Sequence, residues 1–194
     1  MGSRSWNLCC AVGVLLSAVP AVVQASTPPV APNCAPSTTQ SFALDQIVAA
    51  NISNPGTVTR TFTVQGMGPH VWDVDVTVDV AHPRPRDLDI KLTSPSGTVV
   101  WLTTDNGAIS NTFAGTVFDD QADVPVTTAA AFATIVRTAA PEQPLSRLRG
   151  ENPNGTWTLA ITDDTADAEV LGRLYSAHLG VTSVPELPSE VLSS

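Results

Sequence analysis

A strict alternation of apolar and polar side chains constrains the fold of this chain more than any other feature. In VWDVDVTVDV, residues 71–80, valine recurs at every second position from Val74 to Val80, with aspartate or threonine between. Successive side chains of a β-strand point to opposite faces of a sheet, so this period of two predicts a strand with one apolar face. We expect Trp72 to share that face with the valines.

The same pattern recurs along the chain, interrupted by residues that favour turns. Leu88, Ile90 and Leu92 alternate with polar residues, and SPSG at 94–97 has proline and glycine at the second and fourth positions of a turn. A hairpin with a return strand at 98–102 is therefore predicted. Further strands are predicted at 57–64, 112–118, 134–137, 156–162 and 175–181.

The segment TTAAAFATIVRTAA, residues 127–140, allows two interpretations. Its alanine content suits a helix, but Thr134, Ile135 and Val136 are β-branched and Pro141 follows, which favours a loop and then a strand. About eight short strands separated by turns predict an all-β protein with an antiparallel, jelly-roll-like β-sandwich.

Both ends of the chain differ from this β-rich region. Residues 1–25 combine Arg4, a short apolar run and small residues, which is typical of a cleaved secretory signal, and the run is too short for a stable membrane span. An uncleaved N-terminal anchor is the alternative. Residues 26–40 are predicted to be a Pro/Ser/Thr-rich linker, 41–182 the sandwich and 183–194 a flexible tail. The protein is therefore expected to be secreted or periplasmic.

The 9 basic and 18 acidic residues give a net charge of −9, which disfavours nucleic acids and anionic membranes as partners. Asp73, Asp75 and Asp79 alternate with the valines, and along a strand they would span about 20 Å. One Ca²⁺, which binds oxygens at about 2.4 Å, would not collect all three. We therefore predict a solvated strand face, whose charges discourage aggregation, rather than a metal site.

Carboxylates at strand ends and in turns are better candidates for calcium ligands, because loops bring oxygens together around one ion. The alternative is that these aspartates cap turns by accepting bonds from their own backbone. The candidate ligands are Asp87, Asp105, Asp119, Asp120, Asp163 and Asp164.

Residues suited to nucleophilic catalysis do not form a recognisable set. A serine protease requires a serine nucleophile, a histidine base and an orienting aspartate. No nucleophile context accompanies His70, His82 or His178, so we assign no catalytic residue and expect structural or surface histidines. Trp157, which follows a tight turn, is predicted to be a core residue, and Trp101 is expected to contribute to sandwich packing rather than to a sugar platform.

Five blocks of sequence carry a family resemblance: VDVTVDVAH (74–82), RDLDIKLTSPSGTVVWLTTDNG (86–107), NTFAGTVFDDQA (111–122), RTAAPEQPLSRLRGENPNGTWTLAITDD (137–164) and LGRLYSAHLGV (171–181). Together they resemble the P domain, or P/Homo B domain, which accompanies subtilisin/kexin-type catalytic domains in proprotein convertases and bacterial serine proteases. The resemblance implies a jelly-roll sandwich that packs against a protease domain, supports its folding and tunes its pH and calcium dependence.

The resemblance implies an exported, non-catalytic module that binds or stabilises a partner, either a subtilisin/kexin-like serine endopeptidase or another extracellular protein, with Ca²⁺ as the candidate cofactor. Two alternatives stay open. One is a fragment or subunit of a serine-type endopeptidase whose catalytic domain is encoded elsewhere. The other is a cell-surface or carbohydrate-binding module.

Overall fold

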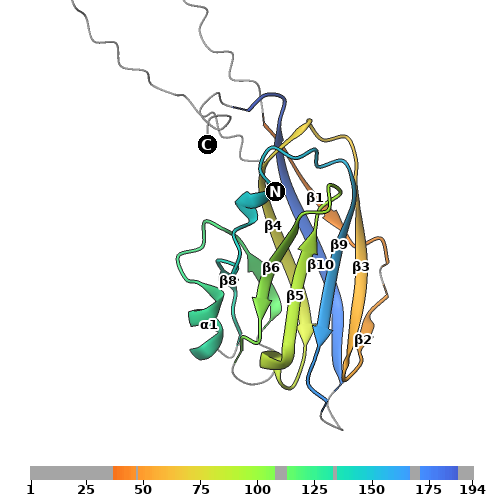
Figure 1. Cartoon of the computed structure of the whole chain (residues 1–194), viewed down its shortest axis with the longest axis vertical. Coiled ribbons are helices and arrows are strands. Elements are labelled where there is room, and N and C mark those ends of the chain that lie inside the picture. The colour runs from red at the N-terminus through yellow and green to blue at the C-terminus, as the bar shows by residue number, and fades with distance from the viewer. Residues whose placement is uncertain (1–36, 47, 108–112, 133–134, 167–170, 188–194) are drawn as a thin grey trace, which may run out of the picture.

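Two β-sheets stacked face to face form the protein (Figure 1). The computed structural model describes residues 37–46, 48–107, 113–132, 135–166 and 171–187. The elements are, in chain order, β1 (Thr38–Ala43), β2 (Ala50–Ile52), β3 (Gly56–Val64), β4 (His70–Ala81), η1 (Pro85–Asp87), β5 (Leu88–Thr93), β6 (Val99–Thr104), β7 (Ala114–Phe118), α1 (Val126–Phe132), β8 (Thr138–Ala139), η2 (Leu145–Leu148), β9 (Gly155–Asp163) and β10 (Gly172–Val184). The predicted all-β sandwich is confirmed.

One sheet has six strands in the order β1-β10-β4-β7-β8, with β2 also paired to β10, and the other has four in the order β3-β9-β5-β6. Every pairing is antiparallel except that of β7 with β8. β4 and β10 share the longest ladder, from Arg173 opposite Ala81 to Val184 opposite His70. The predicted hairpin of β5 and β6 is present.

The valines of β4 face the space between the sheets, as the alternation predicts. Val74 to Val80 are at most 2 % exposed at every second position, and they belong to one core cluster with Trp157, Leu159 and Ile161 of β9. Burial of these apolar faces is the dominant favourable term in folding. The prediction that Trp157 is a core residue is confirmed.

Trp72 does not share the valine face, so that expectation was wrong. The β4–β10 register shifts between Thr182 and Ser183, whose partners are Asp73 and Val71. Such an irregularity reverses the alternation of side chains beyond it. Val71 is therefore buried, while Trp72 is only half-buried.

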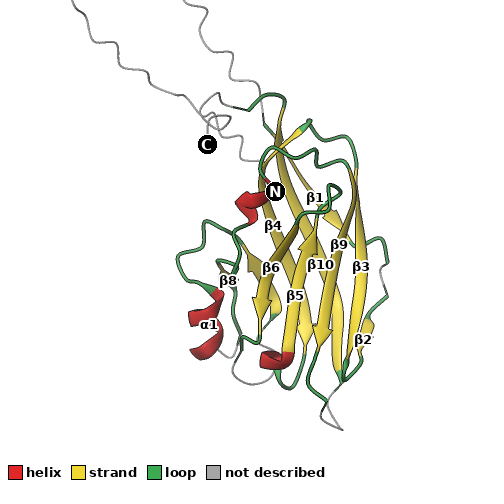
Figure 2. Ribbon diagram, in the orientation of Figure 1, coloured by secondary structure: helices red, strands yellow, loops and turns green. Residues whose placement is uncertain are grey.

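The segment 127–140 begins as a helix rather than a loop, and the predicted strand at 134–137 is wrong for its described residues. α1 starts after Pro125, whose carbonyl accepts the amides of Thr128 and Ala129, and it lies at one side of the sandwich beside β8 (Figure 2). Alanine favours helices intrinsically, and here this preference outweighs the β-branched residues that follow. Only the short β8 pairs with the sheet after it.

The ordered sandwich is longer than the predicted 41–182. β1 begins at Thr38, inside the predicted linker, and β10 continues to Val184, inside the predicted tail. β1 is almost wholly exposed, so its sequence carries no alternation that marks a strand. The predicted signal at 1–25 lies outside the described residues. Among the helices that the structure describes, none is long and apolar enough to cross a bilayer.

Polar side chains cover the outer edges of the four-stranded sheet. At β3, the Asp45 carboxylate accepts the Thr63 amide at 3.0 Å and the hydroxyls of Thr61 and Thr63. At β6, Glu142 accepts the Thr104 amide at 2.9 Å and Gln143 accepts that of Trp101 at 3.2 Å. Backbone groups occupied in this way are not open for pairing with another chain.

At one end of the sandwich, the SPSGT turn is fastened to the GENPNG loop. Glu151 accepts the hydroxyls of Ser94 at 2.6 Å and Thr98 at 2.5 Å, and its carbonyl accepts the Val71 amide at 2.7 Å. A Cβ at Gly155 would come within 2.9 Å of Pro95 Cβ. The two blocks, some fifty residues apart in sequence, therefore form one structural unit.

We expect Glu151→Ala to lower the free energy of unfolding by about 2 kcal/mol, because it removes two hydrogen bonds to a carboxylate. Glu186→Ala removes an exposed carboxylate and should stay within about 0.5 kcal/mol of the wild type. Urea unfolding followed by tryptophan fluorescence measures both. Equal stabilities for the two variants would contradict the role given to Glu151.

Candidate functional site

Three of the six candidate calcium ligands lie close together, at the end of the sandwich where β5 begins and β6 ends. Asp87 precedes β5, Asp105 follows β6 and Asp164 follows β9. The Asp164 amide donates to the Asp87 carbonyl at 3.3 Å, and Asp89 and Glu142 complete this end cluster. The structure therefore brings together carboxylates from four separate parts of the sequence.

Carboxylates in the end cluster repel one another. Partial burial raises the pKa of Asp89, and the charges of Asp105, Asp164 and Glu142 raise it further. Burial also raises the pKa of Asp105, followed by the effects of Asp164, Asp87 and Glu142. Accumulated negative charge of this kind favours a proton or a cation at the cluster.

Asp119 and Asp120 lie elsewhere, beside the aspartate ladder of β4. They follow β7, which pairs with β4, and they form an outer-face cluster with Asp73 and Asp75. The Asp120 carboxylate accepts the Leu145 amide at 2.7 Å and that of Ser146 at 2.8 Å, so it fixes the start of η2. The Gln121 side chain reaches Asp73.

The predicted solvated aspartate face is only partly solvated, because Asp73, Asp75 and Asp79 are each half-buried. Burial raises the pKa of Asp75 to about 7, and the charges of Asp73, Asp119 and Asp120 add to the increase. Asp75 Oδ1 is buried without a hydrogen-bond partner. The strand pattern alone did not show that residues 119–121 return to this face.

Asp163, the sixth candidate ligand, is bonded to His82 in the interior. Asp163 Oδ2 lies 3.1 Å from His82 Nε2, and both side chains are at most 1 % exposed. The Arg84 amide donates to His82 Nδ1 at 3.1 Å, so Nδ1 carries no proton and Nε2–H donates to the carboxylate. Asp163 Oδ1 accepts the Thr165 amide at 3.2 Å.

The His82–Asp163 bond joins the two sheets, because His82 follows β4 and Asp163 ends β9. The sequence contained a signal for it. His82 continues the inward alternation of Val78 and Val80, and Asp163 continues that of Leu159 and Ile161, so both polar residues fall on inner faces. A buried polar group needs a partner, and each supplies one for the other.

The described side chains do not form a ready metal site. Among residues that the structure describes, no group of three or more His, Cys, Asp or Glu side chains is arranged to hold an ion. The end cluster has the charge for Ca²⁺ but not the converging geometry, so its residues do not fit the ion as they stand. Calcium binding stays a prediction.

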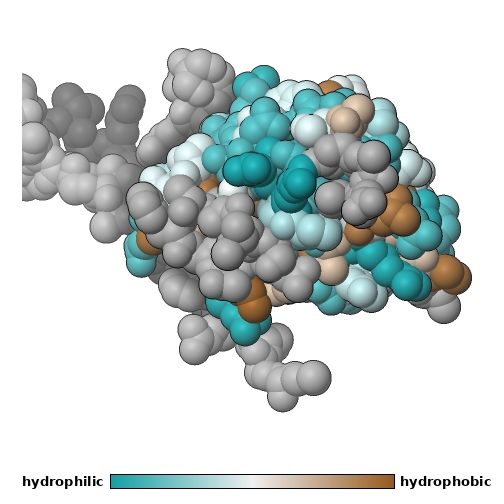
Figure 3. Space-filling view, turned by 90° about the horizontal axis from the view of Figure 1, so that it is seen from below, coloured by the Kyte–Doolittle hydropathy of each residue, from teal (hydrophilic) through white to brown (hydrophobic). Residues whose placement is uncertain are grey.

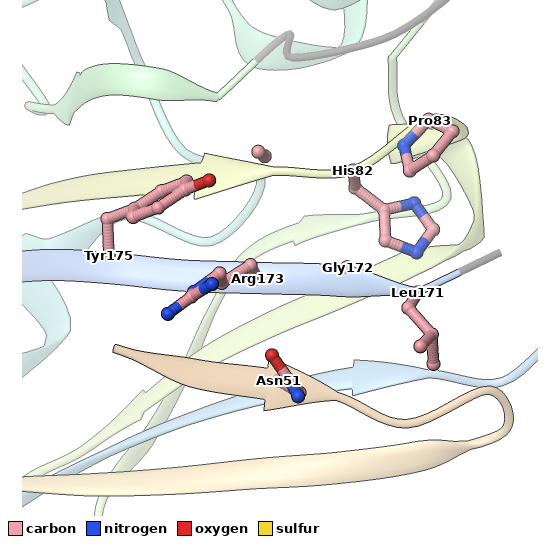
Figure 4. Close-up of a pocket in the computed structure, with 8 residues that line it drawn as sticks. Asn51, His82, Pro83, Leu171, Gly172, Arg173 and Tyr175 are labelled. Atoms are coloured by element: carbon pink, nitrogen blue, oxygen red, sulfur yellow. The ribbon is translucent and has the colours of Figure 1, made fainter. Parts of the chain in front are cut away.

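A hollow of about 390 Å³ lies where β2, the end of β4 and the start of β10 meet (Figure 4). Asn51 flanks it on one side, and His82 and Pro83 on the other. Arg173 and Tyr175 stand on β10 between them, with the guanidinium 5.5 Å from the ring centroid. Seen from below, this end of the molecule is mainly hydrophilic with small scattered apolar patches (Figure 3). Sequence reasoning missed this hollow, because a cation and an aromatic two residues apart are unremarkable on a strand.

Comparison with models of known protein families gives a match for this chain. The family model described as the proprotein convertase P-domain matches residues 71–181, which is more than half of the sequence. The chain belongs to the P-domain family. The resemblance carried by the sequence blocks is thereby confirmed. The match runs from β4 to β10 and includes the sheet-to-sheet bond and both carboxylate clusters.

Solved structures similar to this P-domain include the serine protease of Aeromonas sobria, with 22 % identity and a TM-score of 0.40, over 82 % of this chain and 28 % of that one. The complex of Aeromonas sobria serine protease with the chaperone ORF2 gives 19 % identity and a TM-score of 0.36, over 76 % and 26 %. This chain thus corresponds to little more than a quarter of those chains. The search of curated proteins gave no match.

We expect Asp163→Ala to destabilise the P-domain by about 1–3 kcal/mol, because the buried Nε2–H of His82 loses its acceptor. Asp164→Ala changes the exposed neighbour and should stay within about 0.5 kcal/mol of the wild type. Chemical unfolding of both variants in EGTA excludes a contribution from calcium. A loss of stability no larger for Asp163→Ala than for Asp164→Ala would show that the bond contributes little to holding the sheets together.

Asp75 makes stability depend on pH. Its pKa is about 7 in the folded state against 3.8 for the free side chain, so the folded protein binds the proton more tightly. The stabilisation from protonated Asp75 is therefore complete below about pH 4 and lost as the pH rises through about 7. As the pH rises from 4 to 8, the thermal midpoint of the wild type should therefore decrease relative to that of Asp75→Asn.

Asp79→Asn is the matched control for this measurement, since Asp79 lies on the same face of β4. Its thermal midpoint should follow that of the wild type across the range. If the thermal midpoints of Asp75→Asn and the wild type changed in parallel with pH, protonation of Asp75 would not be the source of the pH dependence.

Proposed function

We propose that this P-domain is an exported, non-catalytic module that binds and stabilises a partner protein, a subtilisin/kexin-like serine endopeptidase. The observation that carries the proposal is the family match over residues 71–181. P-domains are named for proprotein convertases, so a protease is the partner that the family favours. The fold agrees with a supporting role, because a closed sandwich presents preformed surfaces that lose little entropy on binding.

The polar interior supports structure rather than bond cleavage. His82 uses both ring nitrogens, one for Asp163 and one for the Arg84 amide. His70 bonds the Gly150 carbonyl at 3.1 Å, and His178 is exposed on β10. A serine nucleophile needs a histidine that is free to accept its proton. The activity of the proposed complex would therefore reside in the partner.

A closely related alternative is that the chain is a subunit of a serine endopeptidase whose catalytic domain is encoded as a separate chain. The P-domain would bind the catalytic domain in the same way in both cases. A different kind of function, carbohydrate binding, is suggested by Trp72 and Trp101, which are half-buried and could stack against a sugar. Arg149 lies 4.6 Å from the Trp72 ring centroid, and Lys91 lies 4.8 Å from that of Trp101. These cations take positions that a stacked sugar would need, so the protein partner is favoured.

Purified chain should not hydrolyse casein or dibasic peptides, and it should raise the thermal midpoint of a subtilisin/kexin-like catalytic domain encoded near it. Binding to the folded partner raises that midpoint by mass action. Turnover that survives repeated purification would contradict the non-catalytic role. An unchanged midpoint with equimolar chain would contradict the protease partner.

Calcium is expected to stabilise the chain at millimolar concentrations, since the end cluster has the charge but not the preformed geometry. Thermal unfolding in CaCl₂ and in EGTA should differ by several degrees. Asp105→Asn should reduce that difference, and Asp79→Asn, outside both carboxylate clusters, should preserve it. Equal midpoints in CaCl₂ and EGTA would leave the aspartates as turn and surface residues.

A further inference from the structure

The hollow beside β10 has a floor that depends on a single glycine. A Cβ at Gly172 would collide with the His82 ring and come within 3.1 Å of Ile52 Cδ1. The ring cannot move away easily, because Asp163 and the Arg84 amide hold both nitrogens. The hollow is therefore part of the rigid frame that joins the two sheets.

Apolar and donor groups surround this floor. Leu171 is 68 % and Tyr175 50 % exposed, which is unusual for large apolar side chains on this protein. The Arg173 guanidinium is held at the Tyr175 ring, and the Asn51 amide faces it from β2 (Figure 4). Tyrosine and arginine are the residue types most often found as binding hot spots.

The charge of the lining is opposite to that of the whole chain. The lining residues that the structure describes include Arg173 and no carboxylate, in a protein of net charge −9. Asp79, on the neighbouring strand β4, pairs with Ser176, which lies beside the hollow rather than in it. Asp163, beneath the floor, is bonded to His82 and fully buried. Among the described lining residues, an anionic group therefore meets a cation and no opposing carboxylate.

We propose that this hollow is a recognition site for an acidic peptide segment of a partner protein, in which a glutamate or aspartate stands beside an aliphatic side chain. Arg173 binds the carboxylate through charge-assisted hydrogen bonds, and the Asn51 amide supplies a further donor. Leu171 and the Tyr175 ring cover the aliphatic side chain. A volume of about 390 Å³ accommodates side chains of this size and not a folded domain. The site needs no protease as partner, so it goes beyond the function proposed above.

Short blocked peptides test the site directly on the full chain. Titration of ¹⁵N-labelled protein with N-acetyl-Leu-Glu-amide should give saturable shifts at Gly172, at the Asn51 side chain and at Arg173 Nε. N-acetyl-Leu-Gln-amide, which lacks only the charge, should bind about tenfold more weakly. Arg173→Gln should weaken the glutamyl peptide by a similar factor, and Leu171→Ser should weaken both peptides.

Arg147→Gln is the matched control, because Arg147 is an exposed cation on η2, away from the hollow. It should change the affinity by less than about twofold, since distant exposed charges are screened by salt. Thermal midpoints confirm that all variants are folded. Equal losses in Arg147→Gln and Arg173→Gln, equal binding of both peptides, preference for N-acetyl-Leu-Lys-amide, or shifts that never saturate would each overturn the site.

Discussion

The contact between the valine face of β4 and the inner face of the four-stranded sheet is the constraint on which the structure depends. Val74 to Val80 are buried at alternate positions, and Trp157, Leu159 and Ile161 of β9 belong to the same core. Once these faces meet, the intervening residues of both strands must point outward. The aspartates of β4 are thereby placed on the outer face, and the strand ends are placed where loops can converge.

Polar groups complete this apolar core at both ends of the sandwich. At one end, His82 and Asp163 occupy inner positions and satisfy each other across the gap between the sheets. At the other, Glu151 links the SPSGT turn to the GENPNG loop. Buried groups that are fully bonded favour one arrangement of the layers, because any other would leave them unsatisfied. The relative position of the two sheets is thus specified as well as stabilised.

The sequence predicted the parts of the fold that local rules govern. Alternation identified β4, the turn residues of SPSG identified the β5–β6 hairpin, and ordered blocks identified the family. It did not predict β1, which is exposed on both faces, or α1, where alanine content outweighed the β-branched residues nearby.

The candidate sites depended on contacts between distant residues and were harder to predict. The sequence grouped six aspartates as candidate calcium ligands, but it did not show that the fold would bring together only Asp87, Asp105 and Asp164. It also treated Asp119 and Asp75 as unrelated, although the β4–β7 pairing places them in one cluster. The reversal at Trp72 came from a shift in strand register, which residue type alone does not show.

The covered edges of the four-stranded sheet have a consequence for the behaviour of the protein in concentrated solution. The Asp45 side chain accepts the Thr63 amide of β3, while the Gln143 and Glu142 side chains accept the Trp101 and Thr104 amides of β6. Unoccupied strands of neighbouring molecules would otherwise join into continuous ribbons, the first step toward fibrils. With these positions taken and a net charge of −9 keeping copies apart, pairing between copies through this sheet is disfavoured at high protein concentration.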